Sequence, residues 1–128
     1  MRIEHFKGID ECNNIELLPQ ILEKKTEKGV NEFWISETGD YPLIGVLTNQ
    51  NYAYVHYFNE EGEPGFQVIS NENVGLDLKG TSVFYTNTDK EEVYIPNNAV
   101  ITMSRAIEIV SEFFLTNKMP KCVEWFEL

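Results

Sequence analysis

The sequence has few basic residues. Its 128 residues include 10 Lys and Arg against 21 Asp and Glu, which gives a formal net charge of −11. An electrostatic field of this sign repels phosphate backbones and anionic lipid headgroups, so the charge argues against direct binding to nucleic acid or to a membrane. It favours rapid encounter with a positively charged partner.

Cysteine and long apolar stretches are also scarce. The two cysteines, Cys12 and Cys122, lie near opposite ends of the chain, as expected for reduced residues of a cytosolic protein. No apolar run is long enough for a signal peptide or a membrane span. We therefore expect a cytoplasmic location.

Motifs that support catalysis or bind cofactors are missing as well. The eight glycines form no phosphate-binding loop, and no GxSxG, HExxH or CxxC occurs. His5 and His56 stand alone, and a single histidine in a strand pattern is more often structural than catalytic. We expect no enzymatic activity, no cofactor and no bound metal.

Apolar residues are plentiful enough for one core. Hydrophobic residues make up 42% of the chain, with 8 Phe, 6 Tyr and 2 Trp. A chain of this length forms one ordinary domain, and these aromatic side chains supply enough buried area without disulfides or metal. We predict a single domain over residues 1–128, with a monomer favoured.

Two segments have helical periodicity. The first is predicted to span residues 13–28, with Asn13 as its cap and Gly29 as its stop. The second follows an amphipathic apolar stripe at 103–114, and Thr102 is expected to cap it.

Short strand patterns fill the region between these helices. The predicted strands are 32–36, 41–48, 52–58, 66–70, 82–86 and 92–95, with a short extended piece at 100–101 and a final strand at 122–128. Hairpin connectors between consecutive strands indicate antiparallel pairing. The predicted fold is α+β, an antiparallel sheet of about six or seven strands with two helices packed on one face.

The two tryptophans, Trp34 and Trp125, allow two interpretations. Tryptophan is enriched in binding hot spots, but it is also a common core residue, and we favour the core for both. Within the last strand, Trp125 and Phe126 must face opposite sides of the sheet. We expect one of that pair to face the helices and the other the open side.

Negative charge is concentrated in the strand region. Residues 29–101 hold eleven acidic and two basic residues, and so carry −9 of the net −11. Such charge runs are usually solvated loop tips, and their functional interpretation is one side of an electrostatic interface. Two turns contain most of the acidic runs: Glu60, Glu61 and Glu63 in the first, and Asp89, Glu91 and Glu92 in the second.

Several short motifs follow one another in a characteristic order between residues 30 and 128. They are a Tyr-Pro-Leu strand, a Tyr-Phe strand, a proline-marked break, an alanine-bearing helix that ends in Glu-Phe-Phe, a proline and a closing tryptophan. The residues are Tyr41, Pro42, Leu43, Tyr57, Phe58, Pro96, Ala106, Glu112, Phe113, Phe114, Pro120 and Trp125. In this order and spacing the chain resembles the first-described immunity-protein family (Imm-one type) of bacterial polymorphic toxin systems.

The resemblance implies a cytoplasmic antitoxin without activity of its own. It would bind the C-terminal domain of a cognate toxin, often a nuclease or a nucleic-acid deaminase, and block its active site or substrate path. A toxin of that kind needs a basic cleft, which an acidic surface complements. The residues hypothesised to bind the toxin are Glu60, Glu61, Glu63, Asp89, Glu91 and Glu92, with Tyr52 and Tyr54 as exposed aromatics of the sheet.

Two other functions stay open from the residues alone. A small-molecule-binding or hydrolytic α+β domain would need polar groups that converge on an apolar cavity, and the candidates are Tyr54, His56 and Tyr57. A regulatory module for another basic protein would share the same acidic surface.

Overall fold

The computed structural model describes residues 1–128. The regular structure is mainly short strands, with one long helix near the C-terminus. In chain order the elements are β1 (Arg2–His5), β2 (Gly8–Glu11), the 3-10 turn η1 (Ile15–Leu17), α1 (Leu18–Leu22), β3 (Val30–Ser36), β4 (Leu43–Asn49), β5 (Tyr52–Phe58), β6 (Phe66–Ile69), β7 (Thr81–Tyr85), β8 (Glu92–Pro96), η2 (Asn97–Ala99), β9 (Ile101–Thr102), α2 (Met103–Thr116) and β10 (Glu124–Glu127).

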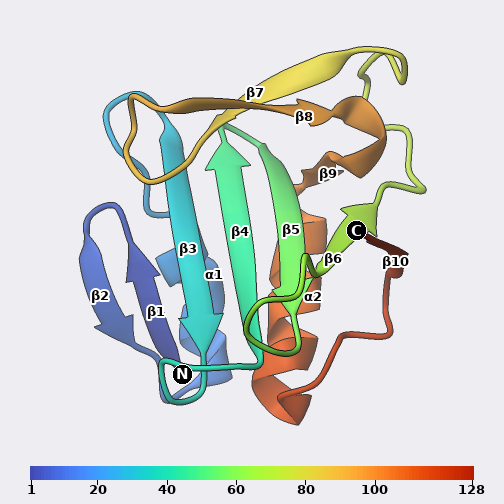
Figure 1. The fold of residues 1–128 in the computed structure, drawn as a ribbon. Coiled ribbons are helices and arrows are strands. Elements are labelled where there is room, and N and C mark those ends of the chain that lie inside the picture. Colours follow the sequence, from blue (N-terminus) through green and yellow to red (C-terminus); the bar gives the residue numbers. More distant parts are fainter.

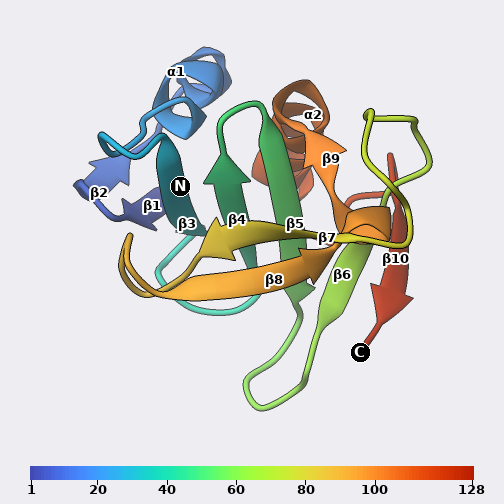
Figure 2. The ribbon, with the colours of Figure 1, turned by 90° about the horizontal axis from the view of Figure 1, so that it is seen from above.

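One antiparallel sheet organises the molecule (Figure 1). Seven of its eight strands follow the order β10-β6-β5-β4-β3-β1-β2, and the eighth, β9, pairs with β5. Both helices lie on one side of this sheet, and a second, two-stranded sheet made by β7 and β8 lies on the other (Figure 2). The predicted α+β fold, with the helices on one face, is confirmed.

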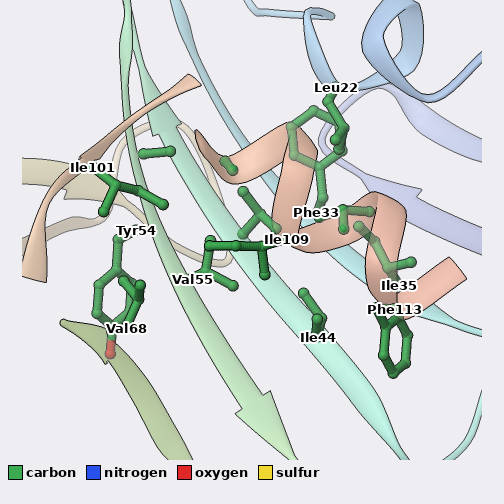
Figure 3. Close-up of a cluster of buried hydrophobic side chains, with 14 of the residues drawn as sticks. Leu22, Phe33, Ile35, Ile44, Tyr54, Val55, Val68, Ile101, Ile109 and Phe113 are labelled. Atoms are coloured by element: carbon green, nitrogen blue, oxygen red, sulfur yellow. The ribbon is translucent and has the colours of Figure 1, made fainter. Parts of the chain in front are cut away.

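The helix face of the sheet carries the core. Alternate residues of β3, β4 and β5 point towards the helices because side chains alternate along a strand. These side chains surround Ile109 and Phe113 of α2, both fully buried (Figure 3). The sheet residues that complete this cluster are Phe33, Ile35, Ile44, Val46, Val55 and Tyr57.

Helix α2 forms where the periodicity predicts it. The Thr102 hydroxyl caps the helix by accepting a hydrogen bond from the backbone N–H of Arg105 at 3.3 Å. Asn117 ends it in the left-handed conformation, with φ 54°. Apolar spacing, cap and stop therefore all agree with the observed helix.

The N-terminal third differs from the prediction. The expected helix over residues 13–28 is wrong in extent, because α1 ends at Leu22 and the cap is Asn14, which precedes η1. Asn31 donates a hydrogen bond to the Lys24 carbonyl (2.8 Å), and the Thr26 N–H donates to the Val30 carbonyl (3.0 Å). These bonds turn residues 24–29 into a connection to β3.

The hairpin formed by β1 and β2 was not anticipated at all. It extends the sheet beyond β3, with Arg2 opposite Glu11 and with Arg2 also opposite Ser36. Its strands have four residues each and mix charged and apolar side chains, so they show no clear period.

Strands β7 and β8 form a hairpin, called here the crossing hairpin (residues 81–96). The prediction that these strands belong to the main sheet is wrong. Both strands occur near the expected positions, but they pair with each other and do not join the main sheet. The crossing hairpin packs against the sheet through Phe84, which is fully buried. An amide hydrogen bond of 3.0 Å from Asn49 to the Val83 carbonyl fixes it over β4.

The two tryptophans have different environments. Trp125 faces the helix side, next to Tyr57 at a ring-centroid distance of 6.2 Å, while Phe126 is 55% exposed on the other side. The predicted split between these neighbours is confirmed. Trp34, in contrast, is 37% exposed, so the prediction that it lies in the core is wrong.

Candidate binding face

The face of the sheet opposite the helices, called here the hairpin face, is only partly covered. The crossing hairpin lies over one part of it and leaves the rest accessible (Figures 1 and 2). Strand register aligns one row of residues across seven strands of the sheet. From edge to edge, this row is Ile9, Glu4, Trp34, Gly45, His56, Gln67 and Phe126.

Large apolar side chains in this row are exposed. Ile9 is 58% exposed and Phe126 is 55% exposed, with Trp34 between them. Contiguous exposed apolar surface is typical of a protein interaction site, whereas singly scattered residues need no explanation. Ile9 and Phe126 lie on the two edge strands, so Trp34, inside the row, is the exposed apolar residue that distinguishes this face. The row therefore marks the hairpin face as the candidate site.

Trp34 is held in place although it is exposed. Gly45 lies opposite it on β4 and has no side chain, so the six-membered ring of the indole packs on the strand backbone. A Cβ atom at Gly45 would lie 2.8 Å from the ring. The Phe58 ring supports the indole from β5, with centroids 5.9 Å apart. Trp34 is thus a rigid aromatic anchor, the residue type most often found in binding hot spots.

Three hollows of the surface meet at Trp34. The first is an apolar groove of about 290 Å³ between the sheet and the crossing hairpin, lined by Leu47, His56, Phe58 and Val93 among others. The second, of about 580 Å³, lies between the β1–β2 turn, β3 and the β7–β8 turn, and its lining includes the acidic residues Glu4, Glu32 and Asp89 together with His5. The third, of about 260 Å³, lies along β1 and β3 and includes Arg2.

Glu32 lines both the apolar groove and the acidic hollow. Its side chain is 5% exposed, yet it forms no ion pair. Two neutral groups of the crossing hairpin donate to it, the Thr86 hydroxyl at 2.5 Å and the Asn87 backbone N–H at 3.0 Å. Glu32 therefore fastens the tip of this hairpin to β3.

His56 lies in the floor of the groove among aromatic rings. Its ring centroid is 4.4 Å from that of Phe58 and 5.5 Å from that of Tyr54. Burial lowers the pKa of His56, while a hydrogen bond to the backbone of Pro64 acts in the opposite direction. Its Nε2 atom is buried and has no hydrogen-bond partner. These surroundings favour the neutral form of the His56 side chain, as part of an apolar surface.

The two acidic turns occupy different places. The first, at residues 59–65, connects β5 and β6 at one end of the sheet, and the second connects β7 and β8 beside β3 (Figure 1). Glu60 and Glu61 are exposed, whereas Glu63 caps its own turn by accepting from the N–H groups of Asn59 (2.7 Å) and Glu60 (3.2 Å). The structure does not bring the two turns together.

In the second turn, Asp89 is half-buried and lines the acidic hollow. Glu91 and Glu92 are exposed and accept from Asn87 (2.6 Å) and Tyr94 (2.8 Å), respectively. Of the six acidic residues predicted from sequence, Asp89 is therefore the one that lies in the hollow beside Trp34.

The two tyrosines predicted as exposed are not free surface residues. Tyr54 is 5% exposed, so its predicted exposure is wrong. Its hydroxyl donates to the Gln67 side chain at 3.0 Å, and burial raises its pKa to about 12. Tyr52 is half-buried and donates to the Val74 carbonyl at 2.9 Å. The difference has two causes: Tyr54 lines the groove between the sheet and the crossing hairpin, with Val93 and Ile95, and Tyr52 lies against Val74 in the connection between β6 and β7.

No group of three or more His, Cys, Asp or Glu side chains is arranged to hold a metal ion. None of the helices has the length and apolar character that a membrane crossing requires.

Sequence reasoning missed Glu4, Glu32 and Trp34 as members of one site. They lie on β1 and β3, and the β1–β2 hairpin was not predicted. A usable signal was the alternation in β3, where the polar Glu32 and the aromatic Trp34 share one face while Phe33 and Ile35 share the other.

Comparison with known proteins gives two matches. The family model described as Immunity protein Imm1 matches residues 16–127. The chain is also similar to the double-stranded DNA deaminase immunity protein of Burkholderia cenocepacia (strain H111), with 26% identity over 129 residues and 100% of both chains covered. The β1–β2 hairpin, which supplies Glu4 and Ile9 to the hairpin face, lies outside the part matched by the family model.

Proposed function

This chain belongs to the Imm1 immunity protein family, and from that premise we propose that it neutralises a toxin domain that deaminates or cleaves nucleic acid. A deaminase is the favoured class, because the similar Burkholderia protein is named as the immunity protein of a double-stranded DNA deaminase. The protein binds the toxin domain, covers its substrate cleft and keeps nucleic acid out.

The charge of the chain is the observation that best supports this mechanism. An enzyme that acts on nucleic acid needs a basic cleft, because phosphate contacts provide much of its affinity for substrate. A partner with a net charge of −11 is attracted to the same cleft. Competition for one basic surface explains how an immunity protein without catalytic groups can stop an enzyme.

We assign the contact to the hairpin face and its rim. Asp89 lies in the hollow beside Trp34 and is a direct candidate. Four further acidic residues are exposed: Glu60, Glu61, Glu91 and Glu92. Their electrostatic field raises the rate of association with the toxin domain more than it raises the affinity of the complex.

The remaining predicted residues have supporting roles. Glu63 shapes its turn, and Tyr52 and Tyr54 build the sheet under the crossing hairpin. In this proposal the protein is a cytoplasmic monomer of a polymorphic toxin system. It has no catalytic activity and needs no cofactor.

Co-expression tests the proposal directly. The catalytic domain of the toxin encoded beside this chain is expressed alone and together with it, and survival of the culture is measured. We expect death with the toxin domain alone and survival with both. Death in both cultures, although both proteins are present in soluble form, would contradict the proposed function.

A second measurement identifies the mechanism. The purified toxin domain is assayed for deamination and for cleavage of double-stranded DNA with increasing amounts of this protein. Inhibition that is relieved by more DNA, and that weakens as salt increases, is expected for competition at a basic cleft. Inhibition indifferent to both DNA and salt would contradict occlusion of the cleft.

A further inference from the structure

We propose that the hollow beside Glu32 and Trp34 is a receptor for one arginine side chain of the toxin domain. This inference rests on the proposed function and adds to it the point of contact and its chemistry. In this arrangement the guanidinium group enters between β3 and the β7–β8 turn, pairs with the Glu32 carboxylate and stacks on the Trp34 indole.

The Glu32 carboxylate is the first observation. A buried charge is normally paired with an opposite charge or bound to a metal, because its removal from water is unfavourable. Glu32 is 5% exposed and has only two neutral donors from the crossing hairpin. It also lines two surface hollows, so a group that enters either hollow lies next to Glu32. The missing counter-charge is a cation that the chain itself does not supply.

No salt bridge of the chain involves Glu32, and four basic residues of the surrounding segments have other partners. Lys28 donates to the Asp89 backbone carbonyl at 2.7 Å and lies over the Tyr85 ring at 4.5 Å. Arg2 lies 4.0 Å from Glu4, in the third hollow. Lys24 and His5 both contact Asp10, at 2.8 and 2.7 Å. None of them forms an ion pair with Glu32.

The Trp34 indole is the second observation. It lines the same two hollows as Glu32 and is fixed by Gly45 beneath it and by the Phe58 ring beside it. A cation over an indole face gains electrostatic attraction, and a ring that is already fixed loses little conformational freedom on binding.

Arginine fits this pair better than lysine does. Its planar guanidinium can stack on an aromatic ring while its N–H groups donate to a carboxylate. Glu4 and Asp89 add negative charge to the same hollow. The adjoining third hollow contains one basic residue, Arg2, which already lies near Glu4. A toxin domain with a basic cleft has such arginines to offer.

Binding measurements with matched variants test this inference. The dissociation constant for the toxin domain is measured by calorimetry for the wild type, Trp34→Ala, Glu32→Gln and the control Glu61→Gln. The control also removes one carboxylate, but from an exposed loop tip. We expect the dissociation constant to rise at least about 30-fold for Trp34→Ala and about tenfold for Glu32→Gln. For Glu61→Gln we expect less than about threefold.

The double variant Trp34→Ala/Glu32→Gln adds a more specific readout. If both residues contact the same arginine, the combined loss is smaller than the product of the two single losses, because the second substitution removes an already weakened contact. Thermal unfolding is recorded for each variant, and Trp34→Phe replaces Trp34→Ala if the latter does not fold.

The outcomes separate the two proposals. A wild-type chain that does not bind the toxin domain contradicts the proposed function. A wild-type chain that binds, together with folded Trp34 and Glu32 variants that bind equally well, overturns the arginine receptor alone. A larger effect from Glu61→Gln than from Glu32→Gln also overturns it, and places the contact at the 59–65 turn.

Discussion

The two faces of the sheet are built from the same strands but differ in how they are covered. On the helix face, β3 contributes Phe33 and Ile35, which are at most 1% exposed beneath α1 and α2. On the hairpin face, the same strand contributes Glu32, buried without a cation, and Trp34, 37% exposed. The helix face has a single apolar environment, whereas the hairpin face mixes aromatic rings, a carboxylate and open hollows.

This difference shows how one element can serve two purposes. Because neighbouring residues of a strand point in opposite directions, packing requirements on one face place few restrictions on the other. Stability should therefore depend mainly on the helix face, and binding mainly on the hairpin face. The following four measurements compare how the two faces contribute to stability and to side-chain environment.

The largest effect on stability should come from the helix face. Phe113→Ala removes a fully buried ring that packs edge-on against Tyr57, with centroids 6.1 Å apart. We expect a loss of about 3–5 kcal/mol in the free energy of unfolding, measured by denaturant titration. The matched control Phe126→Ala, on the hairpin face and 55% exposed, should lose less than about 1 kcal/mol. Equal losses would contradict the division.

The contact between Glu32 and the crossing hairpin should have the next largest effect. Thr86→Val removes the hydroxyl that donates to the buried carboxylate at 2.5 Å. A hydrogen bond to a charged group stabilises by about 1.5–3 kcal/mol, and we expect a loss of that order. Thr88→Val, in the same turn but exposed, serves as the control and should change stability by less than about 1 kcal/mol. If the two variants are equally stable, Glu32 does not hold the hairpin.

A smaller effect is expected at Gly45. In Gly45→Ala the new Cβ would lie 2.8 Å from the Trp34 ring, so the ring must move outward into solvent. We expect about 1 kcal/mol of destabilisation, at the low end for overpacking, because the ring is exposed on its other side. In a Trp125→Phe background Trp34 alone fluoresces, and its emission should shift to longer wavelength. Unchanged emission would show that the indole does not depend on Gly45 for its position.

The smallest effect concerns the pH dependence of stability. Burial lowers the pKa of His56 below its ordinary value of 6.5 in the folded state, so the unfolded chain takes up this proton first as pH falls. Stability should therefore decrease as pH falls from 6.5 towards the lowered pKa, and the contribution should be fully present above 6.5. His56→Phe should show a smaller decrease in stability between pH 7 and pH 5 than the wild type. Identical slopes for both proteins would contradict a depressed pKa.

Local patterns predicted the fold where one interaction dominates. In α2 the apolar spacing, the Thr102 cap and the stop at Asn117 all point to the same helix. The apolar run of β4 indicates a central strand, and β4 lies between β3 and β5. The β1–β2 hairpin could not be predicted in the same way, because four-residue strands depend on the β3 edge that pairs with them. Likewise, α1 is shortened because Asn31 donates to the Lys24 carbonyl and the Val30 carbonyl accepts from Thr26, and both Asn31 and Val30 belong to the next strand.

The site was harder to predict because it depends on where the crossing hairpin lies. The sequence analysis predicts β7 and β8 as strands of the main sheet. In that arrangement no hairpin would cover the face that carries Tyr54, and Tyr54 would be exposed. The hairpin instead covers Tyr54 and leaves Trp34 accessible, so Trp34 and not Tyr54 is the exposed aromatic residue of this face. The acidic character of the strand region could be read from composition. The burial of Glu32 without a counter-charge could not be predicted from composition, because it depends on where Thr86 and Asn87 lie.

The indole that rests on the backbone at Gly45 has a consequence for how such a protein diversifies. A fixed aromatic platform keeps its shape while the loops around it change in length and sequence. If the proposed contact is correct, substitutions in the β1–β2 and β7–β8 turns can alter which toxin is recognised without disturbing the packing beneath α2. Related immunity proteins with the same scaffold could therefore acquire new specificities as their toxins change.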